Sequence, residues 1–265
     1  MIFSIPLTTR GTECGPDRWV TLPSIISYME HCRWLWMDEP RLGLVEAVHQ
    51  GHGFYVVEQS IAMNRRFGMD QRCEIRCAMT HAGRSVAEGL QDVLRDDGVQ
   101  LAHCRIRGAF MGPTGRLARL PVKTRQAVFE GELDGVRGTA VEGTPSSLFN
   151  PPQPLRPGSL DLVLPTERPE DVDRYRIIVR ASDIDIFKHV NAANYVRYVA
   201  SALSRRGGSE SIHRAELKYS GQAVVGEVLD VLTWNLGGDV YAADILRGDE
   251  VLFRAVVETE STSAL

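Results

Sequence analysis

The sequence predicts an α+β fold made of two copies of one unit, in which an antiparallel sheet wraps around a long central helix. Three observations lead to this prediction. A proline-rich stretch divides the chain, similar residues recur in the same order on both sides of it, and each side is patterned as a strand, a helix and four further strands. Short turns rich in glycine and aspartate separate the later strands, which favours antiparallel pairing.

The division falls near the middle of the chain. Residues 145–169 contain seven of the thirteen prolines, and such a stretch favours an extended connector over regular structure. We therefore predict an N-terminal repeat at residues 1–125, a proline-rich linker at residues 126–172 and a C-terminal repeat at residues 173–265.

The repeat rests on matched residues at two fixed spacings. Residues 10–13 (RGTE) match residues 180–183 (RASD), 170 positions later. At the same spacing Ser24 matches Asn194, and Tyr28 matches Tyr198. Farther along, Glu58, Ile61 and Gly68 match Glu216, Tyr219 and Gly226 at a spacing of 158. The common order of these matches indicates a duplication.

The elements of the first copy follow from periodicity and turn residues. Residues 2–9 form a strand and residues 23–37 a helix, with Thr21 as its cap and Pro23 in its first turn. Four further strands are predicted at residues 54–63, 72–80, 85–94 and 101–111.

The second copy has the same pattern. A strand at residues 175–180 precedes a helix at about residues 191–206, which Gly207 ends. Tyr195, Val199 and Leu203 recur at helical spacing, so one face of this helix is predicted to pack inward. Strands are predicted at residues 213–219, 227–234, 240–247 and 250–259.

Composition excludes several classes of protein. Apolar residues make up 43% and charged residues 24% of the 265 residues, which excludes disorder as the main state. A net charge of −4 without a basic block argues against nucleic-acid binding. No apolar run is long enough to cross a membrane, and residues 1–10 lack the features of a signal peptide, so we expect a cytoplasmic protein. Five cysteines without a C-x-x-C pair support neither a disulfide framework nor a zinc site.

The segment most informative about chemistry precedes the second helix. Asp185 and His189 lie in a loop that leads into the amino end of this helix. Unpaired backbone N–H groups at a helix start favour negative charge. A carboxylate, an imidazole and such a helix end are the parts that acyl transfer to water requires.

Residues 183–195 spell D-x-D-x-x-x-H-V-N-x-x-x-Y, which resembles the motif of hotdog-fold thioesterases. The doubled arrangement resembles the acyl-ACP thioesterase family, and Arg10, Glu13 and Asp17 are similar to the family's opening motif. The resemblance implies a tandem (double) hotdog fold with one active site between the repeats. It implies a hydrolase that releases a carboxylic acid from acyl-ACP or acyl-CoA, with acyl carrier protein as partner and no cofactor.

The resemblance also implies catalytic positions, of which two are altered here. Asp185 and His189 match, whereas Phe187 stands at an asparagine position and Gln222 at a glutamate position. We expect Asp185 to act as general base toward water or as nucleophile, His189 to hold the substrate or assist the leaving thiolate, and Gln222 to orient the water. Backbone N–H groups near Val190 and Asn191 are expected to polarise the thioester carbonyl.

Further candidates for substrate binding surround these positions, each with a structural alternative. The expected substrate-binding residues are Val190, Asn191, Asn194, Phe187, Trp34 and Met29. Asn191 and Asn194 also suit helix capping. The stripe of Met29, Trp34, Trp36 and Met37 suits either an acyl pocket or the core. Glu30, Glu58 and Gln59 are alternative carboxyl or amide groups for the site. Arg65, Arg66, Arg116 and Arg119 suit contact with an acidic carrier protein or a solvated surface.

Two other functions remain open at this stage. A hotdog protein can act on a thioester without hydrolysing it, as a dehydratase or a cyclisation helper in polyketide assembly does. An acyl-carrier binding module without catalysis is the second alternative. The sequence predicts no nucleic-acid or membrane partner and leaves homodimerisation open.

Overall fold

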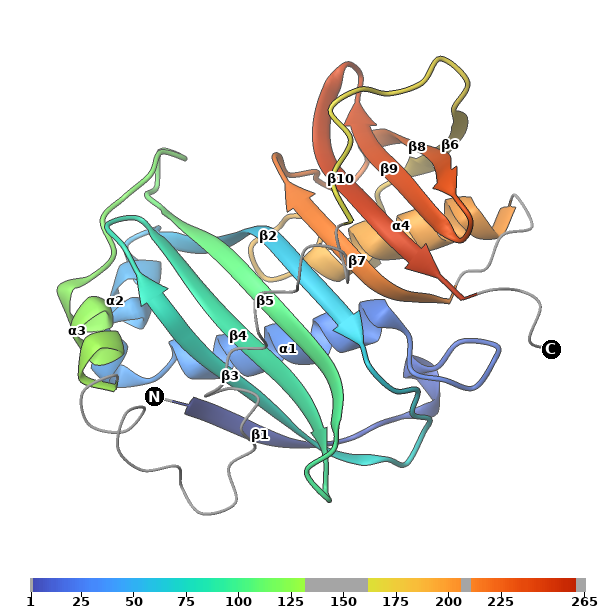
Figure 1. The fold of residues 1–265 in the computed structure, drawn as a ribbon. Helices are drawn as coiled ribbons and strands as arrows, with labels where there is room; N and C mark the ends of the chain where they lie inside the picture. The colour runs from blue at the N-terminus through green and yellow to red at the C-terminus, as the bar shows by residue number, and fades with distance from the viewer. Residues whose placement is uncertain (1, 132–161, 206–210, 261–265) are drawn as a thin grey trace.

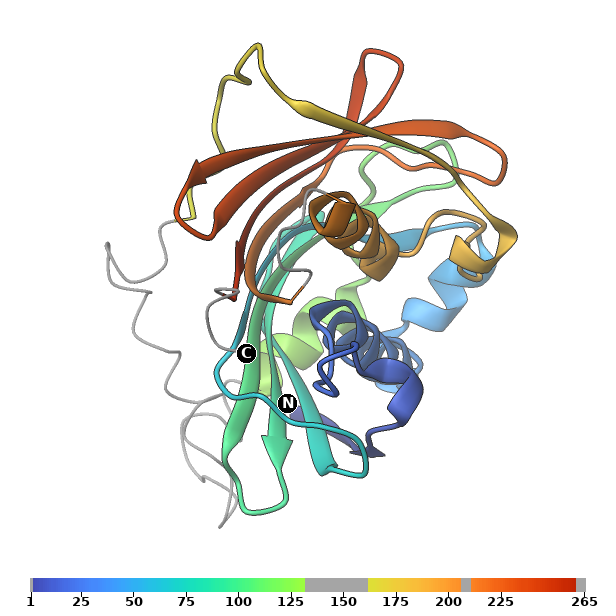
Figure 2. The same ribbon diagram turned by 90° about the vertical axis from the view of Figure 1, so that its right-hand side faces the viewer.

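The computed structural model describes residues 2–131, 162–205 and 211–260. Its described part contains one antiparallel sheet of ten strands with two long helices on the same side (Figures 1 and 2). The strand order is β1-β3-β4-β5-β2-β7-β10-β9-β8-β6. The first five strands in this order come from the N-terminal repeat, and the other five come from the C-terminal repeat. No helix of the described ranges is long and apolar enough to cross a membrane.

Among the described residues, the N-terminal repeat has five strands and three α-helices. They are β1 (Ile2–Thr8), α1 (Leu22–Met37), α2 (Leu44–His49), β2 (Gly53–Met63), β3 (Arg72–Ala82), β4 (Val86–Arg95), β5 (Gln100–Met111) and α3 (Val122–Gly131). The described part of the C-terminal repeat has five strands and one long helix. They are β6 (Asp173–Ile178), α4 (Ala192–Arg205), β7 (Ile212–Tyr219), β8 (Val228–Gly237), β9 (Val240–Arg247) and β10 (Glu250–Thr259).

Every strand and both long helices predicted from the sequence are present, with ends displaced by at most three residues. The short helices α2 and α3 were not predicted. Helix α3 crosses the predicted end of the N-terminal repeat at residue 125, and the Thr124 hydroxyl donates a hydrogen bond of 2.6 Å to the Leu42 carbonyl. Most of the predicted linker, residues 132–161, lies outside the described residues, so the domain boundaries remain a prediction.

The matched residues at spacing 170 make the same contacts in both repeats. The Glu13 carboxylate binds the Arg10 side chain at 2.5 Å and accepts a hydrogen bond from the Tyr28 hydroxyl of α1. In the second repeat the Asp183 carboxylate accepts a hydrogen bond of 2.8 Å from the Tyr198 hydroxyl of α4. Each contact ties the loop before a long helix to that helix, which explains why these residues recur.

The two repeats join along β2 and β7. These strands pair antiparallel from Glu58 opposite Lys218 to Ala62 opposite Arg214, so the sheet continues from one repeat into the other. Figure 2 shows α1 and α4 beside each other on one face of the curved sheet. The amino end of each long helix therefore lies near the other repeat.

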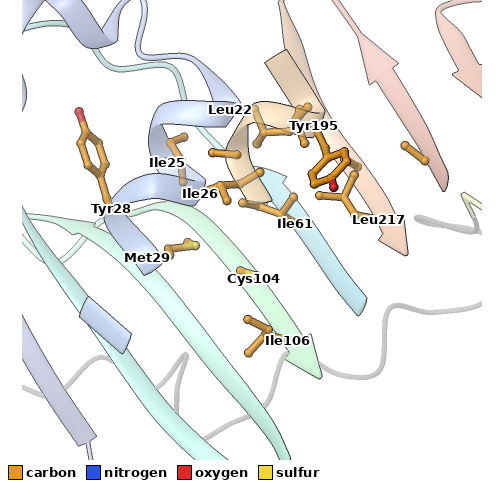
Figure 3. Close-up of a cluster of buried hydrophobic side chains, with 14 of the residues drawn as sticks. Leu22, Ile25, Ile26, Tyr28, Met29, Ile61, Cys104, Ile106, Tyr195 and Leu217 are labelled. Atoms are coloured by element: carbon orange, nitrogen blue, oxygen red, sulfur yellow. The ribbon is translucent and has the colours of Figure 1, made fainter. Parts of the chain in front are cut away.

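The core at this seam is built from both repeats. Figure 3 shows side chains of α1, including Ile26, beside Ile61 of β2, Leu217 of β7 and Tyr195 of α4, all of them buried. Ten of the sixteen residues of α1 are buried, because the sheet covers one side of this helix and α4 covers another. Burial on two sides makes a charged residue on α1 unusual, and Glu30 is such a residue.

Removing the cap of α1 should weaken the fold. Thr21 precedes α1, and its hydroxyl accepts a hydrogen bond from the Ser24 amide. Thr21→Ala should lower the free energy of unfolding by about 1 kcal/mol, measured by urea denaturation. Thr166→Ala, at an exposed threonine, is the matched control and should have little effect. Equal stability of the two variants would contradict the role of the cap.

Candidate active site

A cavity of 520 Å³ opens between the two repeats at the amino end of α4. Its walls come from α1, the start of β2, the segment after β5, the loop before α4 and the segment after β7. Four charged or titratable side chains in the lining bear on the chemistry. They are Glu30, Arg33, Asp185 and His189. The expected location of the site between the repeats therefore coincides with a cavity.

The loop that carries Asp185 and His189 is a tight turn. The Asp185 amide donates to the His189 carbonyl, and the Lys188 amide donates to the Asp185 carbonyl, both at 3.0 Å. The Asp185 Oδ1 atom accepts a hydrogen bond of 2.8 Å from the Phe187 amide. Lys188 has a φ of +65°, and Arg18 at the matched position of the first repeat has a φ of +69°. Asp185 and His189 are the first and last residues of this turn, and both line the cavity.

The start of α4 corrects one expectation. The amides of Val190 and Asn191 are engaged within the fold, because they donate to the carbonyls of Ala223 and Asp183 at 2.9 Å. Neither amide is available to polarise a thioester carbonyl. The Ala192 amide donates no hydrogen bond within the described ranges, and Ala192 lines the cavity. The candidate oxyanion donor is therefore one residue farther along than expected.

Asn191 caps α4 and connects it to α1. Its Oδ1 atom accepts a hydrogen bond of 3.0 Å from the Ala193 amide, and its Nδ2 atom donates one of 2.6 Å to Glu30 Oε2. Glu30 lines the cavity from α1 and is 9% exposed. Burial raises the pKa of the Glu30 carboxyl, although Arg33 and Asn191 act in the opposite direction. Sequence analysis named Glu30 only as an alternative group for the site. The feature that could have indicated its role is a carboxylate in a helix of mostly apolar residues.

Aromatic side chains form one wall of the cavity. The Phe187 ring lies 6.2 Å from the Trp34 ring and 6.3 Å from the Tyr55 ring, measured between centroids. The His189 ring lies 6.3 Å from the Tyr55 ring. Phe187, which replaces a polar residue of the family motif, is therefore part of an apolar wall. Gln222 also lines the cavity, with an exposed side chain.

Three expected substrate-binding residues do not line this cavity: Asn191, which caps α4, and also Met29 and Asn194. Met29 is completely buried in the core, and its carbonyl accepts a hydrogen bond of 2.8 Å from the Gln91 side chain. The Asn194 side chain donates to the Asp183 carbonyl at 2.9 Å and accepts from Arg197. Met29 and Asn194 both support the fold. Met29 faces the core, and Asn194 is bonded to the loop that precedes α4.

Gln59 and Glu58, the other alternative groups for the site, differ in their distance from the cavity. Gln59 is buried, and its Oε1 atom accepts a hydrogen bond of 3.0 Å from the hydroxyl of Tyr219, which lines the cavity. Glu58 contacts Arg107 on the neighbouring strand at 3.4 Å and does not line the cavity. No cluster of three metal-ligating side chains occurs in the described part of the chain.

A second cavity of 340 Å³ lies at the amino end of α1. It is the counterpart of the first cavity, since the bridge between Cys14 and Val20 matches the bridge between Ile184 and Val190. At spacing 170, however, Gly15 replaces Asp185 and Trp19 replaces His189. The second cavity therefore has no carboxylate at the position of Asp185 and no imidazole at the position of His189.

Comparison with known proteins agrees with this architecture. Residues 166–255 match the family model described as the acyl-ACP thioesterase C-terminal domain. The 12:0-ACP thioesterase from Umbellularia californica superposes with a TM-score of 0.75 at 20% identity, covering 97% of this chain and 96% of that chain. A structure described as an oleoyl thioesterase from Lactobacillus plantarum gives 0.73 at 18% identity, covering 98% of both chains. An acyl-ACP thioesterase from Bacteroides thetaiotaomicron gives 0.70 at 14% identity, covering 98% of both chains. A search of curated protein sequences gave no match.

The fold is thus the double hotdog of these thioesterases, as the sequence predicted. The match to the acyl-ACP thioesterase family model lies in the C-terminal part of the chain. The matched region includes the loop of Asp185 and His189.

Proposed function

We propose that this protein hydrolyses acyl-ACP, releasing a fatty acid and the carrier thiol. The single observation that carries the proposal is the turn before α4. It places Asp185 and His189 in the lining of the 520 Å³ cavity at the amino end of this helix. The match of residues 166–255 to the acyl-ACP thioesterase family model supports the same chemistry. The direct test is release of free thiol and carboxylic acid from a panel of acyl-ACP and acyl-CoA substrates.

The reaction follows from the groups around the cavity. Asp185, ionised, removes a proton from water while the water oxygen attacks the thioester carbon. The Ala192 amide and the amino end of α4 stabilise the negative charge on the carbonyl oxygen. His189 holds the substrate beside this oxygen. The intermediate then collapses, the C–S bond breaks, and the departing sulfur receives a proton, which gives an acid and a thiol.

The acyl chain fits between α1 and the first half of the sheet. Phe54 and Arg33 line both the main cavity and a small apolar cavity of 40 Å³. Gly108 on β5 leaves room for the Phe54 ring, because an added Cβ at Gly108 would lie 2.0 Å from a ring carbon. Phe54 is therefore placed to limit the length of the bound chain.

Phe54→Ala should shift the preference toward longer acyl chains. Each methylene that gains burial contributes about 0.8 kcal/mol, which corresponds to about fourfold in kcat/KM. A chain-length series of acyl-ACP measures the shift. Trp19→Ala, at the second cavity, is the matched control and should leave the preference unchanged. A chain-length profile of Phe54→Ala equal to that of the unaltered protein would rule out this role.

The carrier protein is proposed to dock beside the cavity mouth. Arg116 and Arg119 are exposed, and the neighbouring Gly115 lines the cavity. Arg65 lies beyond the far end of β2, whose first residues line the cavity. An acidic carrier would therefore meet Arg116 and Arg119 when its acyl group enters the site.

Reversing these charges should weaken recognition of the carrier without changing the chemistry. The double variant Arg116→Glu, Arg119→Glu should raise KM for acyl-ACP at least tenfold at low salt, while kcat stays unchanged, because rim charges act on encounter. Arg65→Glu is the matched control. A KM equal to that of the unaltered protein would contradict docking at this site.

The non-hydrolytic alternatives make different products. A dehydratase or cyclase of polyketide type would leave the thioester bond intact, and mass spectrometry of the carrier-bound product detects this. A binding module would leave the substrate unchanged. We also place the reaction in the cytoplasm, and we expect one chain to suffice because β2 and β7 already join two repeats. Light scattering tests whether the chain forms a homodimer.

A further inference from the structure

The cavity contains a second carboxyl group that the family motif does not assign. Glu30 comes from α1 of the N-terminal repeat, and Asp185 comes from the loop before α4 of the C-terminal repeat. These two are the acidic side chains among the described residues that line the cavity. Gln222 stands where the family motif has a glutamate, so Glu30 is the remaining candidate for a second acid group.

The hydrogen bonds of Glu30 fix where its proton is held. Asn191 Oδ1 accepts from the Ala193 amide, so the Asn191 group that faces Glu30 is the Nδ2 donor. Glu30 Oε2 therefore acts as an acceptor, at 2.6 Å. No described group hydrogen-bonds to Oε1. In the neutral form the proton is on Oε1, the oxygen left for a group in the cavity.

The surroundings of Glu30 favour this neutral form. The side chain is almost completely buried, and burial raises the pKa of the carboxyl. The cation facing it is Arg33 on the same helix, whose guanidinium also donates to the Gln91 side chain. The other titratable groups that line the cavity are Tyr55 of β2, Asp185 and His189 of the loop, Tyr195 of α4 and Tyr219 of β7. Two carboxyl groups in different surroundings suit separate acid and base roles.

Resting on the proposed hydrolysis, we propose that Glu30 is the general acid that protonates the departing sulfur. Asp185 takes one proton from the attacking water, and the C–O bond forms. As the C–S bond breaks, Glu30 Oε1 gives its proton to the sulfur, which leaves as a thiol. The proton on Asp185 then returns to Glu30 through a water molecule in the cavity. Both groups regain their starting states, and one water molecule is consumed for each thioester.

The leaving group provides the test, because an acid matters only when the departing thiolate is basic. Glu30→Gln keeps the size of the side chain and an oxygen that accepts from Asn191, but it has no proton to give. Its kcat/KM for acyl-pantetheine, an alkyl thioester, should fall about 10²–10⁴-fold. Its kcat/KM for the acyl thioester of 4-nitrothiophenol, which leaves as a weakly basic thiolate, should stay within about threefold of the unaltered protein. Asp185→Asn should impair both substrates.

Two outcomes would overturn the assignment while leaving hydrolysis established. One is an unchanged rate of Glu30→Gln with acyl-pantetheine, and the other is an equal loss with both leaving groups. If the unaltered protein hydrolyses neither ester nor any acyl-ACP, both the proposed function and this inference are wrong.

A pH profile of the unaltered protein supplies a measurement that needs no variant. The rate with acyl-pantetheine should fall as the pH rises through the pKa of Glu30, because only the protonated form is active. The rate with the nitrothiophenyl ester should not show this fall. Identical profiles for the two esters would contradict the role of Glu30.

Discussion

Asp185→Asn is expected to lower kcat/KM for acyl-ACP by about 10²–10⁴-fold, the usual contribution of a positioned general base. The substitution removes the base but keeps an oxygen that can accept the hydrogen bond from the Phe187 amide. The turn before α4 should therefore form as before, and the melting temperature should stay the same. Steady-state kinetics and thermal unfolding of the same preparation measure the two quantities together.

Asp17→Asn is the matched control for this prediction. Asp17 lines the second cavity, and its carboxylate accepts a hydrogen bond of 3.1 Å from the Trp19 amide, two residues later, as Asp185 does from Phe187. The control should retain full activity. Retained activity in a folded Asp185→Asn protein would show that Asp185 is not the base.

The largest loss of stability is expected for Phe253→Ala, at about 3–5 kcal/mol. Phe253 of β10 is completely buried, and its ring lies 5.3 Å from the Tyr195 ring and 5.1 Å from the Tyr219 ring. Removing the ring leaves a void that rigid neighbours fill only in part. Because Tyr195 and Tyr219 also line the active-site cavity, KM should rise as well.

Urea denaturation measures the loss of stability for Phe253→Ala. Val225→Ala, at a residue that is 55% exposed, is the control and should change the free energy of unfolding by no more than about 0.5 kcal/mol. A loss below about 1 kcal/mol for Phe253→Ala would show that the surrounding core collapses around the missing ring.

The duplication explains why a single chain can have one catalytic cavity. Pairing of β2 with β7 gives the two long helices equivalent surroundings, and each helix has a cavity at its amino end. Only the second repeat has an aspartate at the position of Asp185 and a histidine at the position of His189. The first repeat contributes Glu30, Trp34 and Tyr55 instead, so each repeat supplies a different part of one site.

Much of this protein is determined locally and could be predicted from the sequence. Alternating apolar residues, glycine turns and the Thr21 cap predict the strands and long helices, because these features act over a few neighbouring residues. The turn that holds Asp185 near His189 is equally local, since its hydrogen bonds join residues at most four positions apart. The repeat could be predicted because matched loops and helices make matched contacts.

Tertiary structure alone decided which of these residues share the cavity. Glu30 and Asn191 are 161 positions apart, and their contact exists only because β2 pairs with β7 and brings α1 beside α4. The same packing buries Met29 in the core. It also gives the amides of Val190 and Asn191 carbonyl partners within the fold, so the Ala192 amide is the one left at the cavity. Periodicity specifies the faces of a helix but not its neighbours, because those depend on long-range packing of the whole chain.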